Sequence, residues 1–172
     1  MMDTRGGAGA VTTVEDRWSA ADLEALRGHY EPLRRFAAVI GRYDVEPDDL
    51  VQEAYAKVLT RHPGQIRDLG PYLRRTVVNL ATDERRRFGR AASVAPKIAT
   101  DGASSDAYPS DLSDLLALSP RVRALLYLVE VEGEQIAPAA TAVGMSSGNA
   151  RVALLRARRR LRAELSKESS GE

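Results

Sequence analysis

Residues 47–87 read PDDLVQEAYAKVLTRHPGQIRDLGPYLRRTVVNLATDERRR and contain two helical patterns of opposite charge, one after the other. Residues 44–53 hold five acids and no base, whereas residues 83–90 hold four arginines against two acids. An acidic surface suits a basic protein partner, and a basic surface suits phosphate. This order of charges is typical of an adaptor between a protein machine and a nucleic acid.

The first pattern predicts a helix that begins at Pro47, because proline fits the first helical position, where no amide hydrogen is needed. Apolar residues recur at spacings of three and four and predict one buried stripe, made of Leu50, Val51, Ala54 and Val58. Polar residues fall on the other side, namely Asp49, Gln52, Glu53 and Lys57. By itself, such an acidic side is more often an ordinary solvated face than a binding surface.

The second pattern predicts a helix that starts near Pro71, with Leu73, Val77 and Leu80 facing a core. The remaining positions form an exposed strip of Tyr72, Arg75, Asn79, Asp83, Arg86 and Arg87. Asparagine is a poor residue for a helix interior, since its side chain competes for backbone hydrogen bonds. Asn79 is therefore a mild indication of a functional role, and a tolerated surface asparagine is the alternative.

The C-terminal half predicts a helix-turn-helix. Ser119 and Pro120 are a cap and a first helical residue, and Gly133 ends the helix that they open. A short helix is expected between Pro138 and Gly144. Ser146 or Ser147 then caps a last helix from about residue 148 to 165.

The last helix has two different faces. Its core side consists of Ala150, Leu154, Ala157 and Leu161. Residues 151–162 contain six arginines and no acid, and arginine matches phosphate oxygens and guanine edges. An Arg-rich solvated surface helix is the alternative, but the preceding turn and short helix favour DNA binding.

Composition excludes several classes of protein. The chain has 172 residues, a net charge of +1 and no cysteine, so it has no disulfide framework and no thiolate metal site. We find no signal-peptide pattern and no apolar run that could insert in a membrane, and we expect a cytoplasmic protein. Neither histidine lies in a metal-binding or catalytic pattern, and there is no phosphate-binding glycine loop. We therefore predict that the chain is not an enzyme and needs no cofactor.

These patterns predict an all-α protein with two small helical domains joined by a flexible linker, the C-terminal domain being a helix-turn-helix. The expected segments are a loose tail (1–18), a helical domain (19–90), a linker (91–111), a helix-turn-helix domain (112–165) and a polar tail (166–172). Trp18 is expected to anchor the start of the first domain.

The motif DDLVQEAYAKVLTR followed by PYLRRTVVNLATDERRR resembles the second conserved region of bacterial RNA polymerase sigma factors, most closely the small extracytoplasmic-function class. The segment from Gly133 onward resembles the fourth region, with the same spacing to Gly144. Five residues depart from the usual pattern of this region. Pro138 and Ala139 replace an acid and an isoleucine. Val152 and Ala153 replace a Ser-Arg pair, and Leu155 is apolar on the face expected to meet DNA. Contact with the −35 element is therefore expected to be weaker or differently specified than is usual.

The resemblance implies three binding surfaces. Core polymerase is expected to bind, through its β′ clamp helices, at Asp49, Leu50, Gln52 and Glu53. The −10 promoter element is expected at Tyr72, Asn79, Asp83, Arg86 and Arg87. The −35 element is expected at Ser147, Asn149, Arg151, Arg156, Arg158 and Arg159. The implied partners are core RNA polymerase (including its β flap) and promoter DNA, and an anti-sigma factor is a third partner to consider.

Two other functions stay open at this stage. The chain could be a helix-turn-helix transcriptional regulator fused to a helical interaction domain. It could also be a sigma-like protein that acts through protein contacts without initiating transcription.

Overall fold

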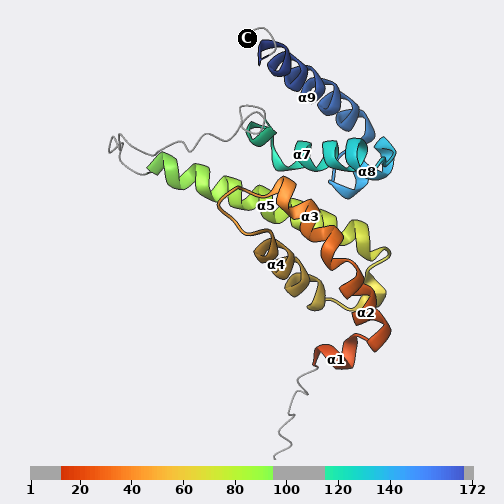
Figure 1. Cartoon of the computed structure of the whole chain (residues 1–172). Coiled ribbons are helices and arrows are strands. Elements are labelled where there is room, and N and C mark those ends of the chain that lie inside the picture. Colours follow the sequence, from red (N-terminus) through yellow and green to blue (C-terminus); the bar gives the residue numbers. More distant parts are fainter. Residues whose placement is uncertain (1–12, 95–114, 169–172) are drawn as a thin grey trace, which may run out of the picture.

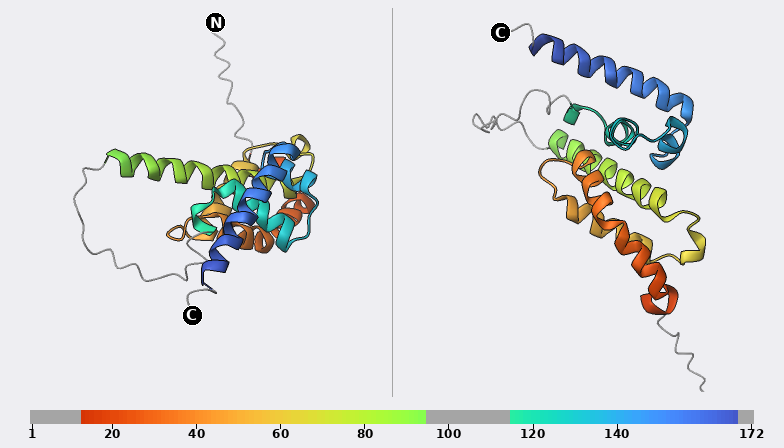
Figure 2. Two further views of the ribbon diagram at one scale, coloured as in Figure 1. Left: turned by 90° about the horizontal axis from the view of Figure 1, so that it is seen from above. Right: turned by 45° about the vertical axis from the view of Figure 1, so that its right-hand side comes forward.

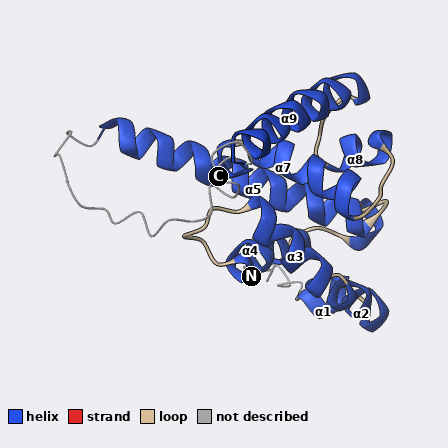
Figure 3. Cartoon of the chain, turned by 45° about the horizontal axis from the view of Figure 1, so that its top comes forward, coloured by secondary structure: helices blue, strands red, loops and turns tan. Residues whose placement is uncertain are grey.

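The computed structural model describes residues 13–94 and 115–168, and every regular element in these two ranges is helical (Figure 3). The all-α prediction is therefore confirmed. The elements are α1 (Val14–Arg17), α2 (Ala20–Gly28), α3 (Tyr30–Ile40), α4 (Pro47–Leu59), η1 (Pro63–Gln65), α5 (Leu69–Val94), α7 (Pro120–Leu126), η2 (Tyr127–Val131), α8 (Ile136–Ala142) and α9 (Ser147–Glu168).

The N-terminal group of helices, α1 to α5 (residues 14–94), begins at a buried tryptophan. Trp18 is buried, and its indole Nε1 donates to the carbonyl oxygen of Arg61 at 3.0 Å. Ser19 then caps α2 in a reciprocal capping box with Asp22. Trp18 thus anchors the domain as expected, but α1 shows that residues 14–17 are helical and do not belong to a loose tail. Residues 1–12 of that tail lie outside the described residues.

Helices α3, α4 and α5 pack against one another around a core of small and branched apolar side chains. The stripe predicted for α4 is buried as expected, and Pro47 occupies the first position of the helix. The three α5 residues predicted to face a core are buried as well, and Val78 joins them. This packing buries the apolar face of α4 and the apolar face of α5. The polar faces of both helices therefore point outward.

Helix α5 is longer than expected. It begins at Leu69, with Pro71 in its first turn, and continues to Val94. The predicted linker started at residue 91, so its first four residues are helical, as their alanines allow. The rest of that linker, residues 95–111, lies outside the described residues. The C-terminal end of α5 projects beyond the other helices (Figure 2).

The C-terminal group of helices, within residues 115–168, contains the predicted helix-turn-helix. Ser119 caps α7 by accepting from the backbone N–H of Val122, and α7 continues through the π-helical turn η2. Gly144, with φ of 71°, makes the turn between α8 and α9 in a left-handed conformation that other residues avoid. The hydroxyl of Ser146 accepts from the N–H of Asn149 and caps α9. Helix α9 runs to Glu168, three residues into the expected polar tail, whose last four residues are outside the described ones.

The two groups pack directly on each other. Helix α7 contacts α3 and α5, and α8 contacts α5, so α7 and α8 lie between the N-terminal group and α9 (Figure 1). Figure 2 shows the same order of layers from a second direction. The core is therefore continuous across both groups, while α9 lies at the far side of the molecule.

Candidate protein and nucleic-acid interfaces

The outer face of α4 carries the residues expected to meet a protein partner. Asp49, Gln52 and Glu53 are exposed, and Lys57 lies one turn beyond Glu53 with its Nζ 3.4 Å from a carboxylate oxygen of that residue. Leu50 was expected on the same surface, but it is only 1% exposed. Its side chain packs in the core beneath this surface, next to Gly41 at the end of α3.

Besides Glu53 with its contact to Lys57, two acids of residues 44–53 pair with arginines within the molecule. Asp48 accepts from the hydroxyl of Tyr30 and from Nε of Arg34, at 3.1 Å. These hydrogen bonds lower the pKa of Asp48 below its usual range, and the bond from Tyr30 has a larger effect than the bond from Arg34. Asp44 is likewise paired with Arg42, with 2.6 Å between Nη2 and a carboxylate oxygen. The acidic surface left for a partner is therefore narrower than the five acids of the sequence indicate, and it consists of the exposed Glu46, Asp49 and Glu53.

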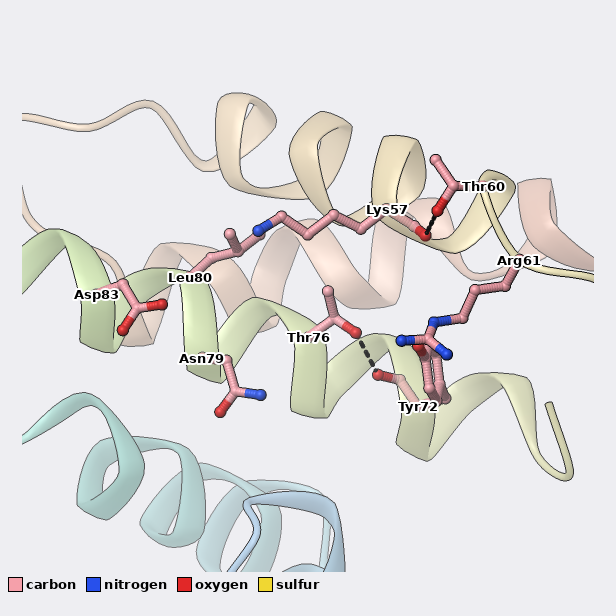
Figure 4. Close-up of a pocket in the computed structure, with 8 residues that line it drawn as sticks. All are labelled: Lys57, Thr60, Arg61, Tyr72, Thr76, Asn79, Leu80 and Asp83. Atoms are coloured by element: carbon pink, nitrogen blue, oxygen red, sulfur yellow. Dashed lines mark hydrogen bonds between the residues drawn. The ribbon is translucent and has the colours of Figure 1, made fainter. Parts of the chain in front are cut away.

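A cavity of about 310 Å³ lies between α4 and α5. Figure 4 shows the side chains that line it: Lys57, Thr60, Arg61, Tyr72, Thr76, Asn79, Leu80 and Asp83. The guanidinium of Arg61 lies over the ring of Tyr72, 5.9 Å from its centre. The cavity therefore joins an aromatic face, a side-chain amide and two cations, which together suit an unpaired nucleotide.

The structure brings most of the residues expected at the −10 element to this cavity or next to it. Tyr72, Asn79 and Asp83 line it directly. Arg86 follows one turn later, with its guanidinium 3.8 Å from the carboxylate of Asp83, and Arg87 is exposed beside it. These five side chains share one side of α5.

Sequence reasoning did not single out Lys57 or Arg61 as candidates for this cavity. Both follow the acidic pattern of α4, and only the packing of α4 on α5 brings them beside Tyr72. The one available signal was their position, since they are the first two bases after an acidic run.

The residues expected at the −35 element lie on α9 with unequal accessibility. Asn149, Arg151, Arg156 and Arg159 are exposed, and Ser147 is half-buried. Arg158 is also half-buried, because its guanidinium is held by Glu130 of η2, with 2.6 Å between Nη2 and Oε1. Arg158 is thus engaged within the protein, whereas Arg156 and Arg159 point into solvent.

Two apolar side chains lie on the same outer face of α9. Val152 is 47% exposed and Leu155 is 51% exposed. Opposite them on the helix, Ala150, Leu154 and Ala157 are buried against α7 and α8. No described residue covers the outer pair.

Three arginines join the N-terminal group to the C-terminal group. Arg123 of α7 donates to backbone carbonyls at the end of α3, and Arg85 of α5 donates to the carbonyl of Leu118 at 2.6 Å. Arg74 of α5 forms ion pairs with two acids that follow η2: Nη2 lies 2.6 Å from a carboxylate oxygen of Glu132, and Nη1 contacts the carboxylate of Glu134. None of these arginines was expected to have this role, because nothing in a single chain pattern shows which helices meet.

Comparisons with known proteins identify two regions of the chain. The family model described as sigma-70 region 2 matches residues 26–91, and the model described as sigma-70 region 4 matches residues 115–161. Together the two matches cover more than half of the chain. A search of curated protein sequences finds no match.

Solved structures share the fold. The sigma factor RpoE from Bartonella quintana, in complex with the anti-sigma factor NepR, is 22% identical with a TM-score of 0.64; the alignment covers 84% of this chain and 96% of RpoE. CnrH in complex with the cytosolic domain of CnrY is 21% identical with a TM-score of 0.57, and the alignment covers 84% of this chain and 86% of CnrH.

The two family matches fall on described helices that present an acidic outer face, a cation-lined cavity and a basic helix-turn-helix, and they identify a transcription factor that meets both protein and DNA. The chain belongs to the sigma-70 family, as a sigma factor of the small extracytoplasmic-function type in which region 2 is followed by region 4. Its partners are core RNA polymerase and promoter DNA. The match to region 2 also argues against a stand-alone regulator with an unrelated helical domain. No helix among residues 13–94 and 115–168 has the length and apolarity to cross a membrane.

Proposed function

We propose that this chain directs core RNA polymerase to promoters and takes part in opening them, with a separate surface for each step. The observation that carries the proposal is the pairing of α4 and α5. These two helices pack side by side, and between the acidic outer face of one and the arginines of the other lies the aromatic, cation-lined cavity. The sigma factor itself performs no chemistry, and it works in the cytoplasm, where bacterial polymerase is found.

The proposed polymerase-binding surface consists of Asp49, Gln52 and Glu53. All three are exposed on one helix, and the carboxylates complement a basic helical surface such as that expected of the β′ clamp. Leu50 supports this surface from beneath, since it is buried against the core. Charge at the edge of such an interface mainly sets the association rate and its salt dependence.

The proposed −10 site is the cavity between α4 and α5 together with the adjoining strip of α5. Tyr72 offers a ring on which a base can stack, and Asn79 offers an amide that can both donate to and accept from a base edge. Arg86 and Arg87 lie on the same side of the helix and are suited to phosphates, and the carboxylate of Asp83 lies 3.8 Å from the guanidinium of Arg86. We add Lys57 and Arg61 to this site as further phosphate-binding groups.

The proposed −35 site is the first half of α9. Ser147, Asn149 and Arg151 lie at the N-terminal turn, which is the part of a recognition helix that meets base edges in the major groove. Arg156 and Arg159 follow on the exposed side and are suited to phosphates. Arg158 would join them only after release from Glu130.

The two predicted domains, residues 19–90 and 112–165, would act separately on the polymerase. The −10 and −35 elements are apart on promoter DNA, so the domains must leave the packed arrangement to reach both. A tether makes the second contact effectively intramolecular, so each domain can bind weakly by itself. RpoE was solved in complex with the anti-sigma factor NepR, and CnrH in complex with the cytosolic domain of CnrY. We therefore also propose an anti-sigma factor as a third partner of this chain.

Run-off transcription tests the proposal. Purified core polymerase from the source organism would be assayed with and without this protein on a pool of genomic promoters. Discrete new start sites that depend on the protein would support it and would reveal the two promoter elements. Polymerase binding without transcripts would favour a sigma-like protein that acts through protein contacts alone.

A matched pair of charge changes makes this test specific. The double change Gln52→Ala with Glu53→Lys should abolish most polymerase binding and all protein-dependent start sites. Glu24→Lys makes the same charge change on α2, where the side chain is 75% exposed, and should leave both unchanged. Equal effects of the two variants would contradict the assignment of the α4 surface.

A further inference from the structure

The outer face of α9 has an apolar centre. At the helical spacing of 100° per residue, Val152 points almost directly away from the buried side that contains Ala150 and Leu154. Leu155 lies one turn along on the same face. Exposed apolar side chains of this size are few among the described residues, and these two are neighbours.

The surroundings of this pair are basic and polar. Asn149 and Arg156 flank it on one side of the helix, and Arg159 follows it one turn later. Residues 147–162 contain no acid, so the face that carries the pair is electropositive along its length. The basic side chains around the pair suit the phosphates that border a DNA groove, and the apolar pair between them would face the base edges.

The size of the pair speaks against a protein partner as the main occupant. A stable protein interface buries about 800 Å² on each partner, which is far more than two side chains provide. Recognition of DNA needs much less apolar contact, because the phosphates supply most of the affinity. The position in the chain agrees, since both residues lie within the part of α9 that the region 4 match covers.

The major groove has one prominent apolar group at its base edges, the C5-methyl group of thymine. Every other edge presents hydrogen-bond donors or acceptors, which an apolar side chain would cover without replacing their bonds to water. An apolar residue that faces the bases therefore favours thymine and disfavours the alternatives. Val152 and Leu155 are three residues apart, about 4.5 Å along the helix, which is close to the spacing of one to two base pairs.

We propose that Val152 and Leu155 are specificity-determining residues that contact the 5-methyl groups of thymines in the −35 element. The inference rests on the proposed function, in which α9 enters the major groove. It assigns a positive role to two of the three positions on α9, Val152 and Leu155 but not Ala153, that depart from the usual polar pattern. The −35 element of this factor should accordingly contain thymine at one or two positions that no arginine reads.

The test has two stages and uses the full chain bound to core polymerase. Selection from DNA with a randomised −35 region first defines the preferred element. Each selected thymine is then replaced by deoxyuridine, which differs only in lacking the methyl group. Loss of one buried methyl contact should weaken binding about fourfold at the one or two contacted positions and leave the others unchanged.

Variants link the effect to the two residues. Leu155→Ser and Val152→Ser should each remove the sensitivity to deoxyuridine at one position and relax the selected sequence there. Val131→Ser is the matched control, because Val131 is 70% exposed but lies on η2, outside α9, and it should keep the wild-type pattern. Circular dichroism would confirm that the variants keep their helical content.

The outcomes separate failure of this inference from failure of the proposed function. Enrichment of a −35 element with no effect of deoxyuridine at any position would overturn the thymine-reading role and leave α9 as the recognition helix. Equal loss of affinity for thymine and deoxyuridine DNA in the serine variants would also overturn it. Weakened polymerase binding with unchanged DNA binding would mean that the pair contacts protein instead. No enrichment of any element would count against the proposed function itself.

Discussion

The guanidinium of Arg123 reaches the C-terminal end of α3, where Nη2 donates to the carbonyl oxygen of Gly41 at 2.8 Å. The same nitrogen donates to the carbonyl of Ile40, and Nη1 donates to the carbonyls of Leu116 and Leu118. A cation at the negative end of a helix is favourable for the helix dipole as well. Because Arg123 belongs to the C-terminal group and Gly41 to the N-terminal group, this single side chain joins the two.

Replacing Arg123 with methionine should destabilise the packed protein by about 2–3 kcal/mol, since it removes hydrogen bonds from a charged donor and leaves buried carbonyls unpaired. Arg123 is only 3% exposed, and burial lowers its pKa to about 10, so it is charged at neutral pH. Urea unfolding would measure the loss. Arg27→Met, at a side chain that is 76% exposed, should change stability by less than about 0.5 kcal/mol. A similar loss in both variants would contradict a specific role for Arg123.

The fork of Arg74 onto Glu132 and Glu134 should hold the two groups together in a salt-dependent way. All three side chains are roughly three-quarters buried, which reduces but does not remove screening. The double change Glu132→Gln with Glu134→Gln should increase the radius of gyration in small-angle X-ray scattering, because the packed population falls. Wild-type protein should approach the same value as salt is raised, whereas the double variant should respond little. An unchanged radius in the variant would show that apolar packing alone keeps the groups together.

Asp48 should make stability depend on pH in the acid range. Its pKa is lowered in the folded state by the hydrogen bonds from Tyr30 and Arg34, so the unfolded chain binds the proton more tightly. The stabilisation is therefore complete above the unfolded pKa of about 4 and is lost as the pH falls through the lower folded value.

Unfolding in urea at several pH values between 2 and 7 would measure this effect. Asp48→Asn should be less stable than wild type at neutral pH, and the difference should shrink below pH 4. Asp49→Asn changes an exposed neighbour on the same turn and should retain the wild-type pH dependence. A constant difference between Asp48→Asn and wild type across the whole range would refute the assignment.

Gly133 should be required for its backbone conformation alone. Its φ is 69°, and an added Cβ would meet nothing within 4 Å. Gly133→Ala should therefore cost about 1–2 kcal/mol, and Gly133→Asn should cost less, because asparagine tolerates the left-handed region. Gly148 also has open space around it but lies in the first turn of α9, so Gly148→Ala should stabilise the helix by up to about 1 kcal/mol. Thermal unfolding would show the opposite signs, and equal signs would refute the conformational explanation.

Local signals in the sequence were sufficient for most of the helices and for the order of their faces, although not for α1 or for the last turn of α5. Ser19, Pro47, Ser119 and Ser146 start helices as their side chains favour, and the buried stripes of α4 and α9 follow the apolar spacing. The exposed residues Asp49, Glu53, Asn149 and Arg156 follow directly from those stripes. These features depend on residues within a few positions of one another, so periodicity and capping are enough to predict them.

Tertiary structure decided which side chains from separate helices meet, and which polar side chains are paired within the protein. It buries Leu50 at 1% exposure, pairs Asp48 with Arg34 and Arg158 with Glu130, and brings Lys57 and Arg61 to Tyr72. It also joins the two helical groups through Arg123, which looks like any other arginine in the sequence. The reason is physical: a helix pattern fixes the direction of a side chain relative to its own axis, whereas contacts between helices depend on how separate cores pack. Charge pairs between helices therefore cannot be read from local spacing, although the faces that form them can.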